Sequence, residues 1–184
     1  MKSSLIALSI LCNLAYAHGG KVEGGISGGG GNVISPTPPK TFQDPREIKA
    51  IIKGSRFLLY QFINAKYALY LKGSMDYESL KLYSVLFADN EDNLHEVMED
   101  IKMNIKTEDS CYDQVGTAYD GSTYDRKEHS ICISAYRIAK NTDKYEVPVQ
   151  AAALILHEYS EVVGLSDEDA IVLQKQVIEE LKNW

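Results

Sequence analysis

The segment from Val149 to Ala170 places one histidine and several carboxylates at helical spacing: V-Q-A-A-A-L-I-L-H-E-Y-S-E-V-V-G-L-S-D-E-D-A. On an α-helix, residues four positions apart share a face, so the His157 imidazole and the Glu161 carboxylate can reach one metal ion. Glu158 is rotated by about 100° around the helix axis, where it can hold a water molecule bound to that metal. The spacing therefore predicts a metal site on one helix, with a proton-accepting group beside it.

Two further signals predict where this helix ends and where the next one begins. Gly164 favours the end of the first helix, because glycine readily adopts the left-handed conformation of helix C-termini. Ser166 is a typical N-cap residue for a last helix. The acidic residues that follow, 167–169, would lie in the first turn of that helix, where its dipole favours negative charge.

The motif at residues 157–167, H-E-Y-S-E-V-V-G-L-S-D, resembles the zincin metallopeptidase signature, which is H-E-x-x-H followed by a glycine and a third ligand. By position, the resemblance implies that His157 is a zinc ligand and that Glu158 is the general base. It implies Asp167 as the third ligand, a role for which Glu168 is also close enough. The order of features along the whole chain also resembles that of small secreted zincin-like proteins of predatory bacteria.

The chain departs from this signature at Glu161, which stands where the second histidine belongs. Carboxylates bind zinc at distances similar to those of histidine. Two carboxylates and one neutral imidazole would, however, cancel the charge of a divalent ion, so its bound water would attack less readily. Oxygen-rich ligation also lets manganese or calcium compete with zinc.

Three interpretations of the motif therefore stay open. The first is a zinc-dependent peptidase that acts on a peptide or protein substrate. The second is a catalytically silent zincin relative that acts as a binding or envelope protein, and the third is an accidental match that binds no metal. A second H-E-x-x-E at residues 95–99 lies in a polar helical pattern and indicates a solvated amphipathic helix.

The N-terminal region has the features of an exported protein. Residues 1–17 combine Lys2, a short apolar core and a final A-Y-A, which is typical of a secretory signal peptide and predicts a periplasmic or extracellular protein. The apolar core is shorter than the roughly 20 residues that span a bilayer, and no later stretch predicts a transmembrane segment. Residues 18–44 are rich in glycine and proline and predict a flexible tail or linker. Residues 45–184 are expected to form one zincin-like domain.

The charge of the chain argues against one class of partner. The sequence has 26 acidic and 19 basic residues and a formal net charge of −7. Such a chain is not expected to bind nucleic acid or an anionic membrane surface by general electrostatics.

The pattern of apolar residues predicts a mostly helical α+β fold, in which a short strand precedes the H-E-x-x-E helix and a C-terminal helix follows it. Helices are predicted over residues 45–71, 76–88, 91–106 and 167–184, a strand over 129–138, and loop with short strand over 107–124. By the resemblance, Ile131–Tyr136 stands in the place of the zincin strand that pairs with extended substrate, although an ordinary sheet strand is the simpler alternative.

Cys111 and Cys132 are the two cysteines that remain once the signal peptide, with Cys12, is removed. In an exported protein they are expected to form a disulfide that stabilises the fold by about 3 kcal/mol. The alternative is a pair of buried thiols.

Overall fold

The structure is a computed structural model that describes residues 30–41, 43–87, 94–113, 115–125 and 128–184. The predicted signal peptide and the first part of the glycine-rich segment lie outside these residues. Among the described helices, none is long and apolar enough to cross a membrane.

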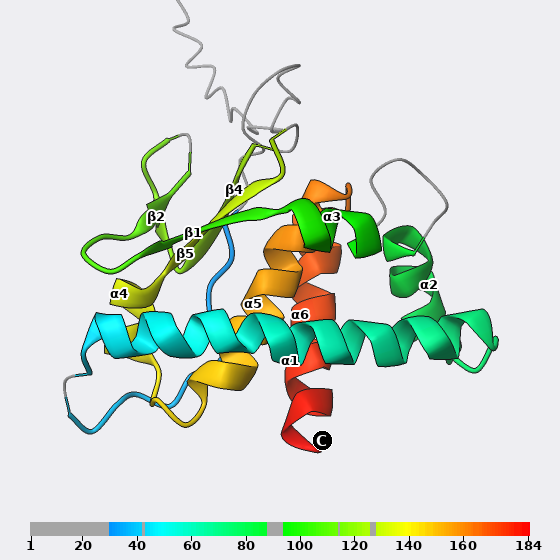
Figure 1. Cartoon of the computed structure of the whole chain (residues 1–184), viewed down its shortest axis with the longest axis horizontal. Coiled ribbons are helices and arrows are strands. Elements are labelled where there is room, and N and C mark those ends of the chain that lie inside the picture. The colour runs from blue at the N-terminus through cyan, green and yellow to red at the C-terminus, as the bar shows by residue number, and fades with distance from the viewer. Residues whose placement is uncertain (1–29, 42, 88–93, 114, 126–127) are drawn as a thin grey trace, which may run out of the picture.

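The described chain is mostly helical with a small mixed sheet, which confirms the predicted α+β class (Figure 1). The helices are α1 (Pro45–Leu71), α2 (Tyr77–Leu86), α3 (Leu94–Asp100), α4 (Ala135–Asn141), α5 (Val147–Val162) and α6 (Asp167–Lys182). The strands are β1 (Lys102–Lys106), β2 (Cys111–Tyr112), β3 (Ala118–Tyr119), β4 (Gly121–Asp125) and β5 (Ser130–Ser134).

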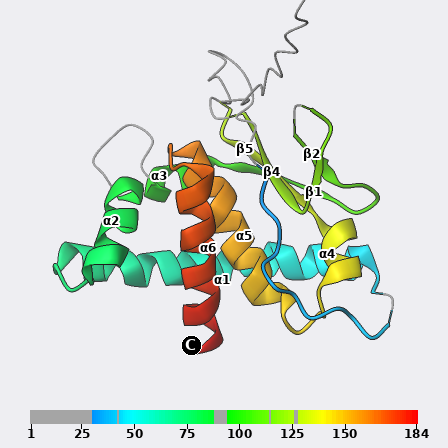
Figure 2. The ribbon, with the colours of Figure 1, turned by 180° about the vertical axis from the view of Figure 1, so that it is seen from behind.

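Helix α5 lies at the centre of the molecule. Helix α1 crosses it on the side seen in Figure 1, and α6 packs beside it on the side seen in Figure 2. Every residue of α5 from Gln150 to Val162 is buried. The apolar run A-A-A-L-I-L suits this position, because a helix that is hydrophobic all round is a buried one. The polar side chains of α5 must therefore find partners inside the protein.

The three-stranded sheet has the order β1-β5-β4, with β1 parallel and β4 antiparallel to β5. Because β5 is paired on both sides, the segment Ile131–Tyr136 begins as an ordinary sheet strand, the simpler of the two alternatives, and offers no edge to a substrate. Strands β1 and β4 are the two edges of this sheet, and β4 packs against α5. Any added strand on this side of the sheet would have to pair with β4.

Two predicted element boundaries are also wrong. The helix predicted over residues 91–106 is α3 followed by β1, because K-M-N-I-K at 102–106 pairs with β5 in register and buries Ile105. The strand predicted over 129–138 ends at Ser134, whose hydroxyl accepts a hydrogen bond from the Arg137 N–H and caps α4. In both places a tertiary or capping contact outweighs the local pattern.

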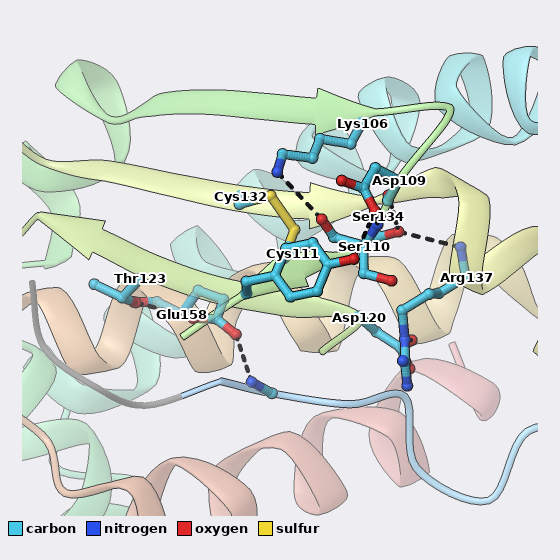
Figure 3. The surroundings of a disulfide bond; sticks show 12 residues. Lys106, Asp109, Ser110, Cys111, Asp120, Thr123, Cys132, Ser134, Arg137 and Glu158 are labelled. Atoms are coloured by element: carbon cyan, nitrogen blue, oxygen red, sulfur yellow. Dashed lines mark hydrogen bonds and ion pairs between the residues drawn. A yellow bond between two sulfur atoms is a disulfide. The ribbon is translucent and has the colours of Figure 1, made fainter. Parts of the chain in front are cut away.

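The predicted disulfide is confirmed, since Cys111 and Cys132 are bonded to each other and link β2 to β5 (Figure 3). Both cysteines are fully buried. The bond ties the two-stranded β2–β3 sheet to the centre of the larger sheet, close to the place where β4 meets α5.

Candidate metal centre

A tight turn between α5 and α6 brings the chain back toward the side of α5 that carries His157. Gly164 adopts a φ of +102°, which glycine reaches without steric cost. The Leu165 N–H then donates to the Ser160 carbonyl at 2.9 Å, and the Ser166 hydroxyl accepts from the Asp169 N–H at 3.2 Å. The predicted helix end and N-cap are both confirmed, and together they place Asp167 opposite the end of α5.

Three of the predicted ligands meet at this turn. His157 Nε2 lies 3.4 Å from Asp167 Oδ1 and 3.9 Å from Glu161 Oε1. One ligand atom from each of the three residues lies within 4.8 Å of the others. Two atoms bound to one tetrahedral zinc ion lie about 3.4 Å apart, because each is about 2.1 Å from the metal. The group therefore has nearly the size of a divalent-metal site.

The imidazole of His157 is buried without a hydrogen bond. Its side chain is 1% exposed, and neither Nδ1 nor Nε2 makes a hydrogen bond with any residue that the structure describes. Such an unsatisfied buried group costs about 1–3 kcal/mol. Burial lowers the pKa of His157, and the Asp167 carboxylate opposes that effect. A neutral imidazole with Nε2 directed at two carboxylates is the form that binds a metal.

The candidate centre is closed on one side and open on the other. The Glu161 side chain is 3% exposed, whereas that of Asp167 is 53% exposed. An ion could therefore arrive, and keep a water ligand, on the side of Asp167. Two carboxylates and one imidazole suit zinc or manganese.

Glu158, the predicted general base, points to the sheet side of α5 and is fully buried. Its Oε1 accepts a hydrogen bond from the Gly31 N–H at 2.9 Å, and its Oε2 accepts one from the Thr123 hydroxyl at 2.9 Å (Figure 3). Gly121 of β4 allows this packing, since a Cβ there would lie 2.7 Å from Glu158 Oε1. The carboxyl is thus confined between β4 and the N-terminal segment.

Burial raises the pKa of Glu158 well above its ordinary value, and the negative charge of Glu161 adds to that effect. The hydrogen bonds from Gly31 and Thr123 act in the opposite direction. Glu158 directly follows His157 and precedes Glu161 by three residues on α5, so it lies within one helical turn of two candidate metal ligands. A carboxyl with a raised pKa near a metal can accept and return a proton.

The remaining predicted site residues do not join the group. Glu168 is exposed in the first turn of α6, and the His157 group does not include it. The second H-E-x-x-E begins in α3, where the side chains of residues 95–97 lie outside the described part of the chain.

The residues that hold the segment before α1 were not predicted from the sequence. Three buried polar side chains bond to the backbone of residues 32–34: Asp120, Gln150 and Gln174. One signal could have found two of them, because Gln150 and Gln174 are polar residues on otherwise apolar helical faces. The glycine-rich composition of residues 18–44 did not indicate that part of this segment binds to these buried side chains.

Comparison with protein-family models, with curated proteins and with solved structures gives no match to this chain.

Proposed function

We propose that this protein is an exported, zincin-like, metal-dependent peptidase in which His157, Glu161 and Asp167 bind one divalent ion. The observation that carries the proposal is the convergence of two carboxylates on a buried imidazole whose nitrogens have no hydrogen bond. Export is proposed from the signal-peptide pattern of residues 1–17, and a disulfide is compatible with an oxidising compartment.

Different residues of this chain would perform the separate steps of peptide hydrolysis. A bound zinc or manganese ion would polarise the peptide carbonyl and acidify a water molecule. Glu158 would take a proton from that water at a carboxylate oxygen and return it to the leaving nitrogen. Thr123, which donates to Glu158 Oε2 at 2.9 Å, would keep the carboxyl oriented.

A catalytically silent metal-binding relative is the second candidate, and one observation favours it. Both oxygens of Glu158 already accept hydrogen bonds inside the protein, and the residue is fully buried. A base in this position would be unable to reach substrate until the segment that includes Gly31 moved away. In the silent form, the protein would act as a binding or envelope protein.

Hydrolysis by the metal-loaded protein distinguishes the two candidates. The full chain would be incubated with zinc or manganese and a mixture of unstructured peptides, and new peptide termini would be identified by mass spectrometry. The peptidase proposal predicts cleavage by wild type and none by Glu158→Gln, which keeps the proposed metal ligands and the size of the side chain. Equal cleavage by both proteins would reject Glu158 as the base, and no cleavage even with the N-terminal segment displaced would favour the silent relative.

A further inference from the structure

Residues 30–37, here called the N-terminal strap, run across β4, α5 and α6 and bend at Ile34 and Ser35. The strap is the blue trace that descends from the sheet along α5 in Figure 2. Its Gly31 carbonyl accepts a hydrogen bond from the Gly121 N–H at 2.8 Å, at the edge of β4. At its other end, the Thr37 N–H donates to Glu146 at 2.9 Å. The strap therefore covers both the edge strand β4 and the buried Glu158.

The body of the protein binds the strap mainly through the strap's backbone. The Val33 N–H donates to Asp120 Oδ2 at 3.0 Å, and the Gln174 amide donates to the Asn32 carbonyl at 2.9 Å. Gln150 makes two bonds to Ile34, accepting from its N–H at 3.2 Å and donating to its carbonyl at 2.9 Å.

Four of the five side chains that bind the strap are at most 2% exposed: Asp120, Gln150, Glu158 and Gln174. The fifth, Glu146, is partly exposed. Buried polar side chains need partners, and each of these has at least one partner in the backbone of the strap. Backbone groups are common to all peptides, so these contacts would serve another extended chain equally well.

Side-chain selection along the strap is confined to a few positions. A Cβ on Gly31 would lie 2.7 Å from Leu154 Cδ1 and 2.8 Å from Glu158 Oε1, and a Cβ on Gly30 would overlap the Tyr119 ring. Val33, by contrast, is 8% exposed and belongs to the hydrophobic core. The groove therefore accepts two consecutive glycines, then an exposed residue, then an apolar residue. At the exposed position, the Asn32 side-chain oxygen accepts a hydrogen bond from the Asp120 N–H at 3.2 Å.

The strap also adjoins the candidate metal centre. The same hypothetical Cβ on Gly31 would lie 3.0 Å from His157 Cδ2, on the residue whose Nε2 faces the two acidic ligands. A peptide in this groove would thus pass directly over His157 and Glu158.

From these contacts we infer that the strap occupies a peptide-binding groove and acts as its built-in competitor. The ligand of this groove is an extended peptide with the pattern Gly-Gly-x-apolar, which takes the strap's place when the strap is displaced. That this ligand is also a substrate rests on the proposed function, whereas binding in the groove does not.

The test converts the strap into an exchangeable peptide in the folded full chain. A recognition sequence for a specific protease is inserted between Lys40 and Thr41, which are both exposed. The chain is cut there after folding, and a labelled synthetic peptide of residues 30–37 is added in excess. Fluorescence anisotropy then reports binding, with the uncut protein as control.

The inference predicts that the labelled peptide binds to the cut protein and not to the uncut one. A peptide carrying Gly31→Val should bind at least about tenfold more weakly, because the added side chain overlaps Leu154 and Glu158. A peptide carrying Ser35→Gly is the matched control and should bind as the native peptide does, since Ser35 is exposed and has a φ of 46°.

Three results would overturn the inference. The first is that the labelled peptide does not bind after cutting, and the second is that the Gly31→Val peptide binds as tightly as the native one. The third is that the near-UV circular dichroism signal is lost when the strap leaves, which would mean that the strap is part of the fold. Metal content measured on the same cut protein separates this inference from the proposed function. A protein that exchanges the peptide but binds no metal would support the groove and reject the peptidase. A protein that binds metal but does not exchange the peptide would support the metal centre and reject the groove.

Discussion

Gly31 and Glu158 are 127 positions apart in the sequence, and the Gly31 N–H donates a 2.9 Å hydrogen bond to Glu158 Oε1. This bond joins the first described residues of the chain to the residue predicted to be the general base. It depends on glycine at position 31, because a Cβ there would meet that same oxygen. The chemistry proposed for α5 and the position of the N-terminal strap are therefore linked.

Gly121→Ala should lower the free energy of unfolding by about 1–3 kcal/mol, because its methyl group would lie 2.7 Å from Glu158 Oε1 and 3.1 Å from Leu154 Cδ1. Gly54→Ala in α1 is the control. No atom lies within 4 Å of its added methyl group, so it should stabilise the protein by about 0.5–1 kcal/mol. Urea unfolding measures both changes. Equal effects of the two substitutions would mean that β4 does not confine Glu158.

Removing the disulfide with the double substitution Cys111→Ser and Cys132→Ser should destabilise the protein by about 3 kcal/mol, since the bond closes a loop with a sequence separation of 21. The midpoint of thermal unfolding should fall in non-reducing buffer. A reducing agent should lower the midpoint of the wild type and leave that of the double variant unchanged. An unchanged midpoint in the double variant would show that the bond contributes no stability.

The contact between Thr37 and Glu146 should respond to acid. The Thr37 hydroxyl and N–H both donate to Glu146 and lower its pKa below the ordinary 4.5, an effect that Lys182 supports and Asp143 opposes. Because the folded-state pKa is the lower one, the contact stabilises the folded chain above about pH 4.5. That stabilisation is lost as the pH falls through the folded-state pKa.

Nuclear magnetic resonance titration of the Glu146 carboxyl carbon measures this effect directly. Thr37→Val should raise the pKa of Glu146 toward its ordinary value. Thr41→Val, at an exposed position that makes no described contact with Glu146, should leave it unchanged. If both variants titrate like the wild type, the strap is not anchored at Thr37.

Asp167→Asn and Glu168→Gln form a matched pair, since each neutralises one acid in the first turn of α6. Asp167 lies 3.4 Å from His157 Nε2, so its loss should weaken zinc binding by about 100-fold or more. Glu168 lies outside the His157 group, so its substitution should leave the affinity nearly unchanged. Isothermal titration calorimetry compares the two. Equal losses of zinc affinity in the two variants would mean that Asp167 contributes only through the general negative charge of this turn.

The local signals were sufficient to predict most of the fold around α5. Apolar periodicity located α1 and α6, and Gly164 and Ser166 located the turn between α5 and α6. Helical spacing predicted that His157 and Glu161 share a face, and the resemblance to the zincin signature implied that Asp167 or Glu168 would join them. Strand β1 was predicted as a helix because its five residues are interpretable only through their pairing with β5. The strap was not predicted because its hydrogen bonds go to residues more than 80 positions away, such as Asp120. Such long-range contacts cannot be inferred from local composition.

Metal content tests the central claim most directly. Wild type and His157→Ala would be exposed to zinc and to manganese, dialysed, and analysed by inductively coupled plasma mass spectrometry. The proposed centre predicts about one ion per wild-type chain and almost none in the variant, because the imidazole is the one nitrogen ligand of the set. A wild-type protein that retains no metal, or a variant that retains as much as the wild type, would contradict it.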